Sequence, residues 1–151
     1  MYQASDVMTT NVTTIAPDAT VDEAIGVLLD NQISGLPVVD ARGMLVGMIS
    51  EFQLLETVFD PQIRNESVRG FMTRDVIAVD DGALLADVAS LFIMHRIRRV
   101  PVLRDGQLVG LITRRDLLRY VAKAGDQIDT FLNEVRRFAT ERSKEAVVPA
   151  G

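Results

Sequence analysis

The sequence contains two copies of one pattern, and this duplication constrains the fold more than any other feature of the 151-residue chain. Because glycines and prolines recur at corresponding places in both copies, the similarity between the copies is not explained by chance. Two copies are too few for a solenoid, so we expect a pseudo-symmetric pair that buries its apolar faces together. The matched segments are Val7-Met8-Thr9 with Phe71-Met72-Thr73, Leu36-Pro37-Val38 with Val100-Pro101-Val102, and Gly47-Met48-Ile49-Ser50 with Gly110-Leu111-Ile112-Thr113.

Apolar periodicity predicts the same order of elements in each copy: strand, helix, strand, strand, helix. In the first copy, Thr20 and Glu23 have the spacing of a capping box, which predicts a helix start. Leu84 occupies the place of Thr20 in the second copy, so that helix must begin by other means. The first copy is expected to have strands at 12–15, 36–39 and 44–49 and helices from 21 and at 51–59. The expected fold class is α/β, more strictly α+β.

These elements predict a domain organisation of two repeats and one extra helix. The first repeat is placed at 6–59, a linker at 60–69 and the second repeat at 70–124. A C-terminal amphipathic helix is expected at 126–145, outside the duplicated pattern. It would pack on its own module, or it would dock on a second subunit or a partner.

Composition excludes several classes of function. The net charge of −5 argues against nucleic-acid binding, which needs a basic face. With no Cys and one His, a transition-metal site or a nucleophilic triad is not expected. No signal peptide and no apolar run of membrane-spanning length is visible, so we expect a cytoplasmic protein without membrane contact.

The second copy ends with Gly110-Leu111-Ile112-Thr113-Arg114-Arg115-Asp116, which combines a strand end with a helix start. Thr113 and Asp116 are three residues apart and therefore share one face of the first helical turn. A helix N-terminus offers free N–H groups to a phosphate, and a carboxylate there can accept hydrogen bonds from a ribose diol. The plainer interpretation is that Thr113 is an N-cap and Asp116 a favourable first-turn acid.

The duplicated frame with this heptad resembles a tandem pair of CBS domains, also called a Bateman module, over roughly residues 6–122. The heptad matches the family's Gly-apolar-x-Thr/Ser-x-x-Asp ligand motif in full. The first copy departs from it, because Gln53 stands where the ribose-binding Asp is expected. An amide binds a diol more weakly than a carboxylate does, which puts the first motif in doubt.

The resemblance also implies which residues gather around each ligand. The segment before the Pro of one repeat is expected to line the cleft completed by the other repeat's motif. Arg98 and Arg99 would then bind phosphate at the second site, or they would form a solvated loop or a subunit contact. The implied ligand-binding set is Asp116, Thr113, Ile33, Ser34, Val12, Thr13 and Ile112, and the implied second site is Ser50, Gln53, Val76, Ile97, Arg98 and Arg99.

The resemblance implies a non-catalytic regulatory module that binds AMP, ADP, ATP or S-adenosylmethionine between its repeats and signals by rearrangement. It requires no cofactor, is expected to form a homodimer, and would act on an effector protein that the sequence does not identify. A CBS-fold dimerisation scaffold without ligand is the alternative, and Gln53 favours it. A third hypothesis is a small hydrolase that uses Asp116 or Asp80 with His95. The sequence shows no arrangement of nucleophile, base and oxyanion hole that would support it.

Overall fold

The computed structural model describes residues 2–124, 133 and 147–148. Contacts divide the chain into two compact units. The first-repeat unit comprises Thr13–Val76. The second-repeat unit comprises the residues from Ile77 onward together with the N-terminal segment through Val12. This division differs from the boundaries of the repeats in the sequence, because each unit includes the segment with which the other repeat begins.

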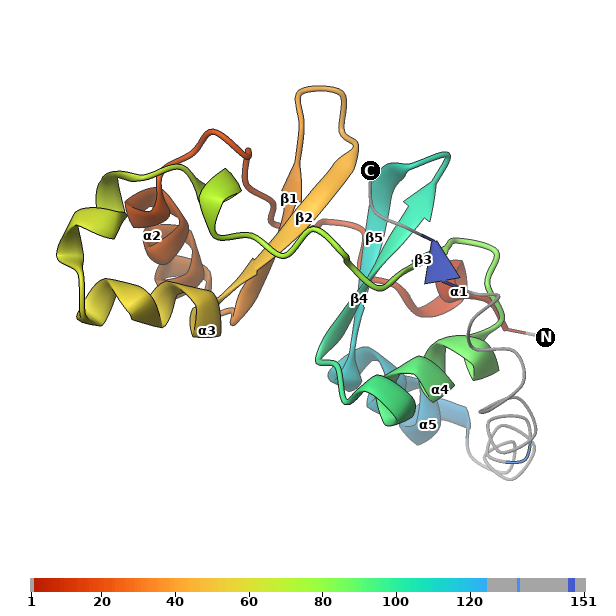
Figure 1. Ribbon diagram of the computed structural model, residues 1–151. Helices are drawn as coiled ribbons and strands as arrows, with labels where there is room; N and C mark the ends of the chain where they lie inside the picture. Colours follow the sequence, from red (N-terminus) through yellow and green to blue (C-terminus); the bar gives the residue numbers. More distant parts are fainter. Residues whose placement is uncertain (1, 125–132, 134–146, 149–151) are drawn as a thin grey trace. The chain divides into compact units, whose positions relative to one another are not determined.

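The first-repeat unit is a hairpin covered by helices (Figure 1). Strands β1 and β2 are antiparallel, with Leu36 opposite Ile49. The buried core comprises Ile15, Val21, Ala24, Leu28, Leu36, Val38, Ile49, Leu54, Val68 and Met72. The elements are α2 (Val21–Asn31), β1 (Gly35–Val39), β2 (Leu45–Ser50), α3 (Glu51–Leu54) and the 3-10 helices η1 (Leu55–Val58), η2 (Pro61–Asn65) and η3 (Val68–Gly70).

The start of α2 confirms the Thr20 half of the predicted capping box, since the Thr20 hydroxyl accepts a hydrogen bond from the backbone N–H of Glu23 at 3.1 Å. The prediction of one closing helix over 51–59 was wrong, because α3 stops at Leu54 and tightens into η1. There the Thr57 hydroxyl donates to the Leu54 carbonyl at 2.6 Å, and this local bond competes with the helical ladder. The strand expected at 12–15 is reduced to one parallel bridge between Ile15 and Val38.

The second-repeat unit has a small mixed sheet in the order β5-β4-β3-β6. Strands β3 and β4 are parallel, and the other two pairings are antiparallel. Helices α4 and α5 pack against each other (Figure 1), with Leu85, Ala86 and Ala89 of α4 against the apolar side of α5. The elements are α1 (Ala4–Val7), β3 (Ala78–Asp80), α4 (Leu85–His95), β4 (Arg99–Arg104), β5 (Gln107–Thr113), α5 (Arg114–Ala124) and β6 (Val147–Val148).

The β4–β5 hairpin turns at Asp105 and Gly106, whose φ angles are 53° and 80°. Two consecutive positive φ angles are the requirement of a type I′ turn, which favours an Asp-Gly pair. The Asp-Gly pair in the sequence thus accounts for the tight turn of this hairpin.

The segments that begin the two repeats are exchanged. The first one packs on the hairpin of the second repeat, and the second one packs on the hairpin of the first repeat. Thr9 bridges Leu111 of β5, and Thr73 bridges Met48 of β2. The same exchange explains how α4 begins without a capping side chain, because the Leu85 N–H donates to the Tyr2 carbonyl at 2.9 Å. A backbone carbonyl of the N-terminal segment thus accepts at the start of α4, where a side chain does so for α2.

The C-terminal amphipathic helix expected at 126–145 lies outside the described residues, apart from Asn133. What the structure does describe beyond α5 includes β6, whose backbone pairs with β3.

Candidate functional site

The heptad of the second repeat forms the junction of β5 and α5. β5 ends at Thr113, and α5 begins at Arg114, so that Asp116 lies in the first helical turn. The Asp116 side chain is only 6% exposed. A nearly buried carboxylate must be compensated by hydrogen bonds, and the surrounding donors identify what holds it.

Four donors contact the Asp116 carboxylate, two on each oxygen. Oδ2 accepts from the Thr113 backbone N–H at 2.8 Å and from its hydroxyl at 3.0 Å. Oδ1 accepts from Arg119 Nη1 at 2.9 Å and from the Thr9 hydroxyl at 3.3 Å. The Oδ2 contacts are those of a helix cap, so the plainer interpretation of the motif holds for one oxygen. Oδ1 instead takes donors from the next helical turn and from the N-terminal segment.

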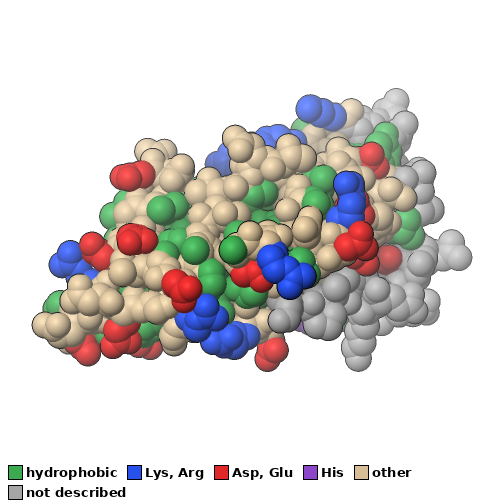
Figure 2. Space-filling model, turned by 90° about the horizontal axis from the view of Figure 1, so that it is seen from above, with side chains coloured by type: hydrophobic (Ala, Val, Ile, Leu, Met, Phe, Trp, Pro, Cys, Tyr) green, Lys and Arg blue, Asp and Glu red, His purple; other side chains and the backbone are tan. Residues whose placement is uncertain are grey.

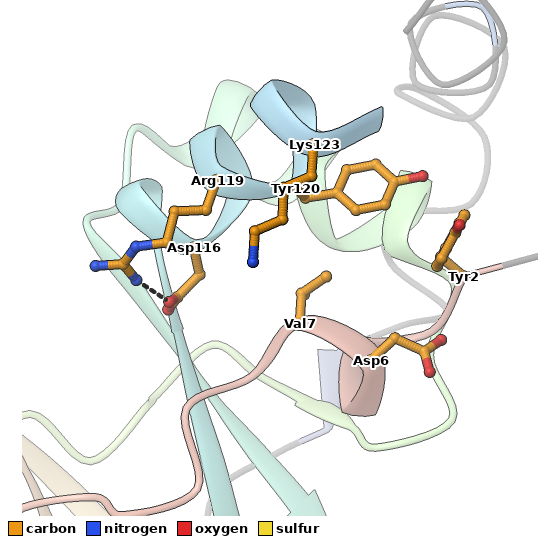
Figure 3. Close-up of a pocket in the computed structure, with 7 residues that line it drawn as sticks. All are labelled: Tyr2, Asp6, Val7, Asp116, Arg119, Tyr120 and Lys123. Carbon is orange, nitrogen blue, oxygen red and sulfur yellow. Dashed lines mark hydrogen bonds and ion pairs between the residues drawn. The ribbon is translucent and has the colours of Figure 1, made fainter. Parts of the chain in front are cut away.

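A pocket of about 500 Å³ lies between α1 and α5 and has Asp116 at one end (Figure 3). Lys123 and Tyr120 reach into it from α5, and the Tyr2 and Tyr120 rings meet edge to face at 4.9 Å. The lining side chains belong to Tyr2, Asp6, Val7, Asp116, Arg119, Tyr120 and Lys123. The pocket therefore combines aromatic surface with charges of both signs.

The first-repeat motif has the same architecture with different chemistry. Gln53 Oε1 accepts from the Ser50 backbone N–H at 2.8 Å and from its hydroxyl at 3.2 Å, as Asp116 Oδ2 does from Thr113. The Gln53 amide nitrogen, at the place of Oδ1, donates to the Thr73 hydroxyl at 2.5 Å. The helix cap is preserved in both copies, whereas the outer acceptor of Asp116 has become a donor in Gln53.

The other residues of the implied sets fall in both units. Within the second-repeat unit, Arg99 is opposite Thr113 in the β4–β5 register, and Ile112 is fully buried in the core. Arg98 is exposed and Ile97 half-buried. The second-repeat unit holds Val12, Ile97, Arg98, Arg99, Ile112, Thr113 and Asp116, and the first-repeat unit holds Thr13, Ile33, Ser34, Ser50, Gln53 and Val76.

Thr9 and Arg119 are the contacts of Asp116 that sequence reasoning did not assign. Arg119 follows Asp116 at the i, i+3 spacing of an ion pair, which is a readable signal. Thr9 is 107 residues away, and its only signal was the recurrence of the Met-Thr pair in both copies.

Within the described residues, no group of three or more His, Cys, Asp or Glu side chains could hold a metal ion. None of the described helices combines the length and apolarity needed to cross a bilayer. Acidic and basic side chains are interspersed over the described part of the face in Figure 2. This face offers no single-sign field of the kind that phosphate backbones need.

Comparison with known proteins decides the family. The CBS domain model matches residues 4–60 and 68–123. The chain belongs to the CBS domain family. Its two matches form a tandem CBS pair with the α+β fold expected from the duplicated pattern.

Three similar proteins illustrate the relationship. An uncharacterized protein of Methanocaldococcus jannaschii, MJ1225, is 35% identical over 76% of this chain, which spans 41% of that relative's length. A crystal structure of CBSX2 in complex with AMP has a TM-score of 0.76 and 31% identity, covering 83% of this chain and 99% of that one. The CBS pair of MJ0100 in complex with 5-methylthioadenosine and S-adenosyl-L-methionine has a TM-score of 0.70 and 26% identity, covering 81% of this chain and 97% of that one.

Proposed function

We propose that this CBS pair is a non-catalytic regulatory module that binds an adenosyl ligand. The observation that carries the proposal is the nearly buried Asp116 carboxylate at the start of α5, inside the complete family heptad. Similar CBS pairs bound to AMP or to S-adenosylmethionine support the ligand class.

In this proposal the ribose diol donates to the Asp116 carboxylate, because a charged acceptor forms stronger hydrogen bonds than a neutral one. In the same proposal the N-terminus of α5 and the Thr113 hydroxyl would meet a phosphate of the ligand. That Val12, Thr13, Ile33, Ser34 and Ile112 complete this site stays a prediction from the family resemblance.

The signal would arise from differential binding. A ligand shifts an equilibrium between conformations only by the difference between its affinities for them. An effector protein or a homodimeric partner would read that shift, and a cytoplasmic location fits adenine nucleotides as the signal. AMP, ADP, ATP and S-adenosylmethionine share the adenosyl group that Asp116 would recognise and differ in the charge they carry.

Isothermal titration calorimetry with these four ligands and with adenosine tests the proposal. We expect at least one of them to bind the wild-type chain. The variant Asp116→Asn should weaken that binding by roughly 10- to 150-fold, since hydrogen bonds to a charged group contribute about 1.5–3 kcal/mol. Asparagine keeps one oxygen for the Thr113 N–H, so the helix cap survives. The variant should therefore stay folded, and a loss of affinity would not be due to unfolding. Equal affinity in both proteins would place the ligand elsewhere.

The alternative function is a CBS-fold scaffold that associates without ligand, with Gln53 as its support. Several large apolar side chains of the first-repeat unit are exposed, with Phe52 at 81% and Phe59 at 90%. A folded wild-type chain that binds none of the ligands but sediments as a stable dimer would favour the scaffold.

A further inference from the structure

Asp116 has no acceptor site left over in this structure. An ionised carboxylate offers about four lone-pair sites, and four hydrogen bonds already reach it. A vicinal diol brings two further O–H donors. Any ligand that binds through a diol must therefore displace donors that the chain itself supplies.

The donors differ in how readily they can leave. On Oδ2, the Thr113 N–H belongs to the backbone at the β5–α5 junction and cannot move away without unfolding the helix start. On Oδ1, the hydrogen bond from the Thr9 hydroxyl is long, at 3.3 Å. The other donor is the guanidinium of Arg119, which ends a flexible side chain that is 63% exposed. Figure 3 shows the Arg119 guanidinium beside the Asp116 carboxylate, with a dashed line for their ion pair. Both donors on Oδ1 are therefore side-chain groups that can move away, whereas Oδ2 keeps one donor that the backbone fixes, beside the rotatable Thr113 hydroxyl.

The first repeat supports this division independently. Gln53 reproduces the Oδ2 contacts with Ser50 but has a donor in place of Oδ1. At the position that corresponds to Arg119, the first repeat has Glu56. The arginine therefore accompanies the carboxylate and is absent from the copy that lacks one.

We propose that Arg119 is an internal competitor of the ligand: it occupies Asp116 Oδ1 in the free protein and must be displaced when a ribose diol binds. This inference rests on the proposed function and adds to it a residue that sets the affinity of the site. Arg119 would lower the affinity for all diol ligands and so raise the ligand concentration at which the site is half occupied. Arg119 should lower the affinity least at high ionic strength, because salt screens its ion pair with Asp116.

The test uses adenosine, which carries the diol but no charge, so that removing a cation cannot act through attraction to phosphate. Calorimetry is run on wild type, Arg119→Ala and Arg115→Ala. The last variant removes the same charge from an exposed neighbour in the first turn of α5 and is the matched control. Arg119→Ala should bind adenosine about two- to fivefold more tightly, the range that exposed ion pairs correspond to, while Arg115→Ala leaves the affinity unchanged.

Ionic strength gives a second readout. Higher salt should tighten adenosine binding by wild type, because the competing ion pair weakens, and should leave Arg119→Ala indifferent. Unchanged or weaker binding by Arg119→Ala, or an equal gain in Arg115→Ala, overturns the inference while the proposed function stands. Binding by Arg119→Ala but not by wild type supports it in its strongest form. Absence of binding in every protein and ligand overturns the inference together with the proposed function.

Discussion

At the scale of single residues, one difference separates the two motifs. Ser50 and Thr113 cap their helices through the same pair of contacts, to Gln53 Oε1 and to Asp116 Oδ2. The outer atom of the side chain is an amide nitrogen in one copy and a carboxylate oxygen in the other. Since a diol needs acceptors, we infer that only the second-repeat motif is equipped for a ribose.

Gln53→Asp should therefore create a second ligand site. Aspartate matches the spacing that Asp116 has from Thr113 and keeps an oxygen for the Ser50 N–H. The stoichiometry measured by calorimetry should rise from about one to about two adenosyl ligands per chain, because a charge-assisted hydrogen bond replaces a mismatched donor. Gln53→Asn, which has the same length as aspartate without the charge, should stay at one. A stoichiometry that is unchanged in Gln53→Asp would show that the first motif lacks more than its carboxylate.

At the scale of elements, the glycines of the two motifs lie where another segment of the chain packs closely against the strand. A Cβ atom built on Gly47 would lie 2.7 Å from Met72 Sδ and 2.8 Å from the Thr73 carbonyl oxygen, which belongs to the backbone. A Cβ atom built on Gly110 would clash with the side chain of Met8. The recurrence of Gly in the heptad therefore has a packing reason besides any role in ligand binding.

Gly47→Ala should lower the free energy of unfolding by about 1–3 kcal/mol, as overpacking does elsewhere. Gly26→Ala is the contrast, because Gly26 lies inside α2 with nothing within 4 Å of the added Cβ. That variant should gain about 0.5–1 kcal/mol from helix propensity. Denaturation by urea measures both, and a neutral Gly47→Ala would show that β2 and the Met72 segment separate easily.

At the scale of the whole molecule, each compact unit depends on a segment that lies before the other repeat in the sequence. Ala4 is fully buried in the core of the second-repeat unit, and its N–H donates to the Ala83 carbonyl at 2.8 Å. Val68 has the corresponding place in the core of the first-repeat unit. The compact units of the fold consequently contain different residues from the repeats of the sequence.

Deletion of residues 1–9 should weaken the second-repeat unit selectively. Amides of β4 and β5 should lose hydrogen-exchange protection, because β5 loses its Thr9 neighbour and α4 its Tyr2 carbonyl. Amides of β1 and β2 should keep theirs, since Phe71-Met72-Thr73 remains in place. Equal loss in both hairpins, measured by mass spectrometry, would contradict this assignment of segments to units.

What the sequence determined by itself is what depends on near neighbours. The duplication, the cap at Thr20, the turn at Asp105-Gly106 and the helix start beside Asp116 follow from spacings of a few residues, and each is found in the structure. Tertiary structure decided the rest. The exchange of N-terminal segments and the contact between Thr9 and Asp116, 107 residues apart, depend on which apolar faces close on one another. Periodicity shows that a face is apolar, but not which segment buries it, because many segments have matching faces and only the packed core selects among them.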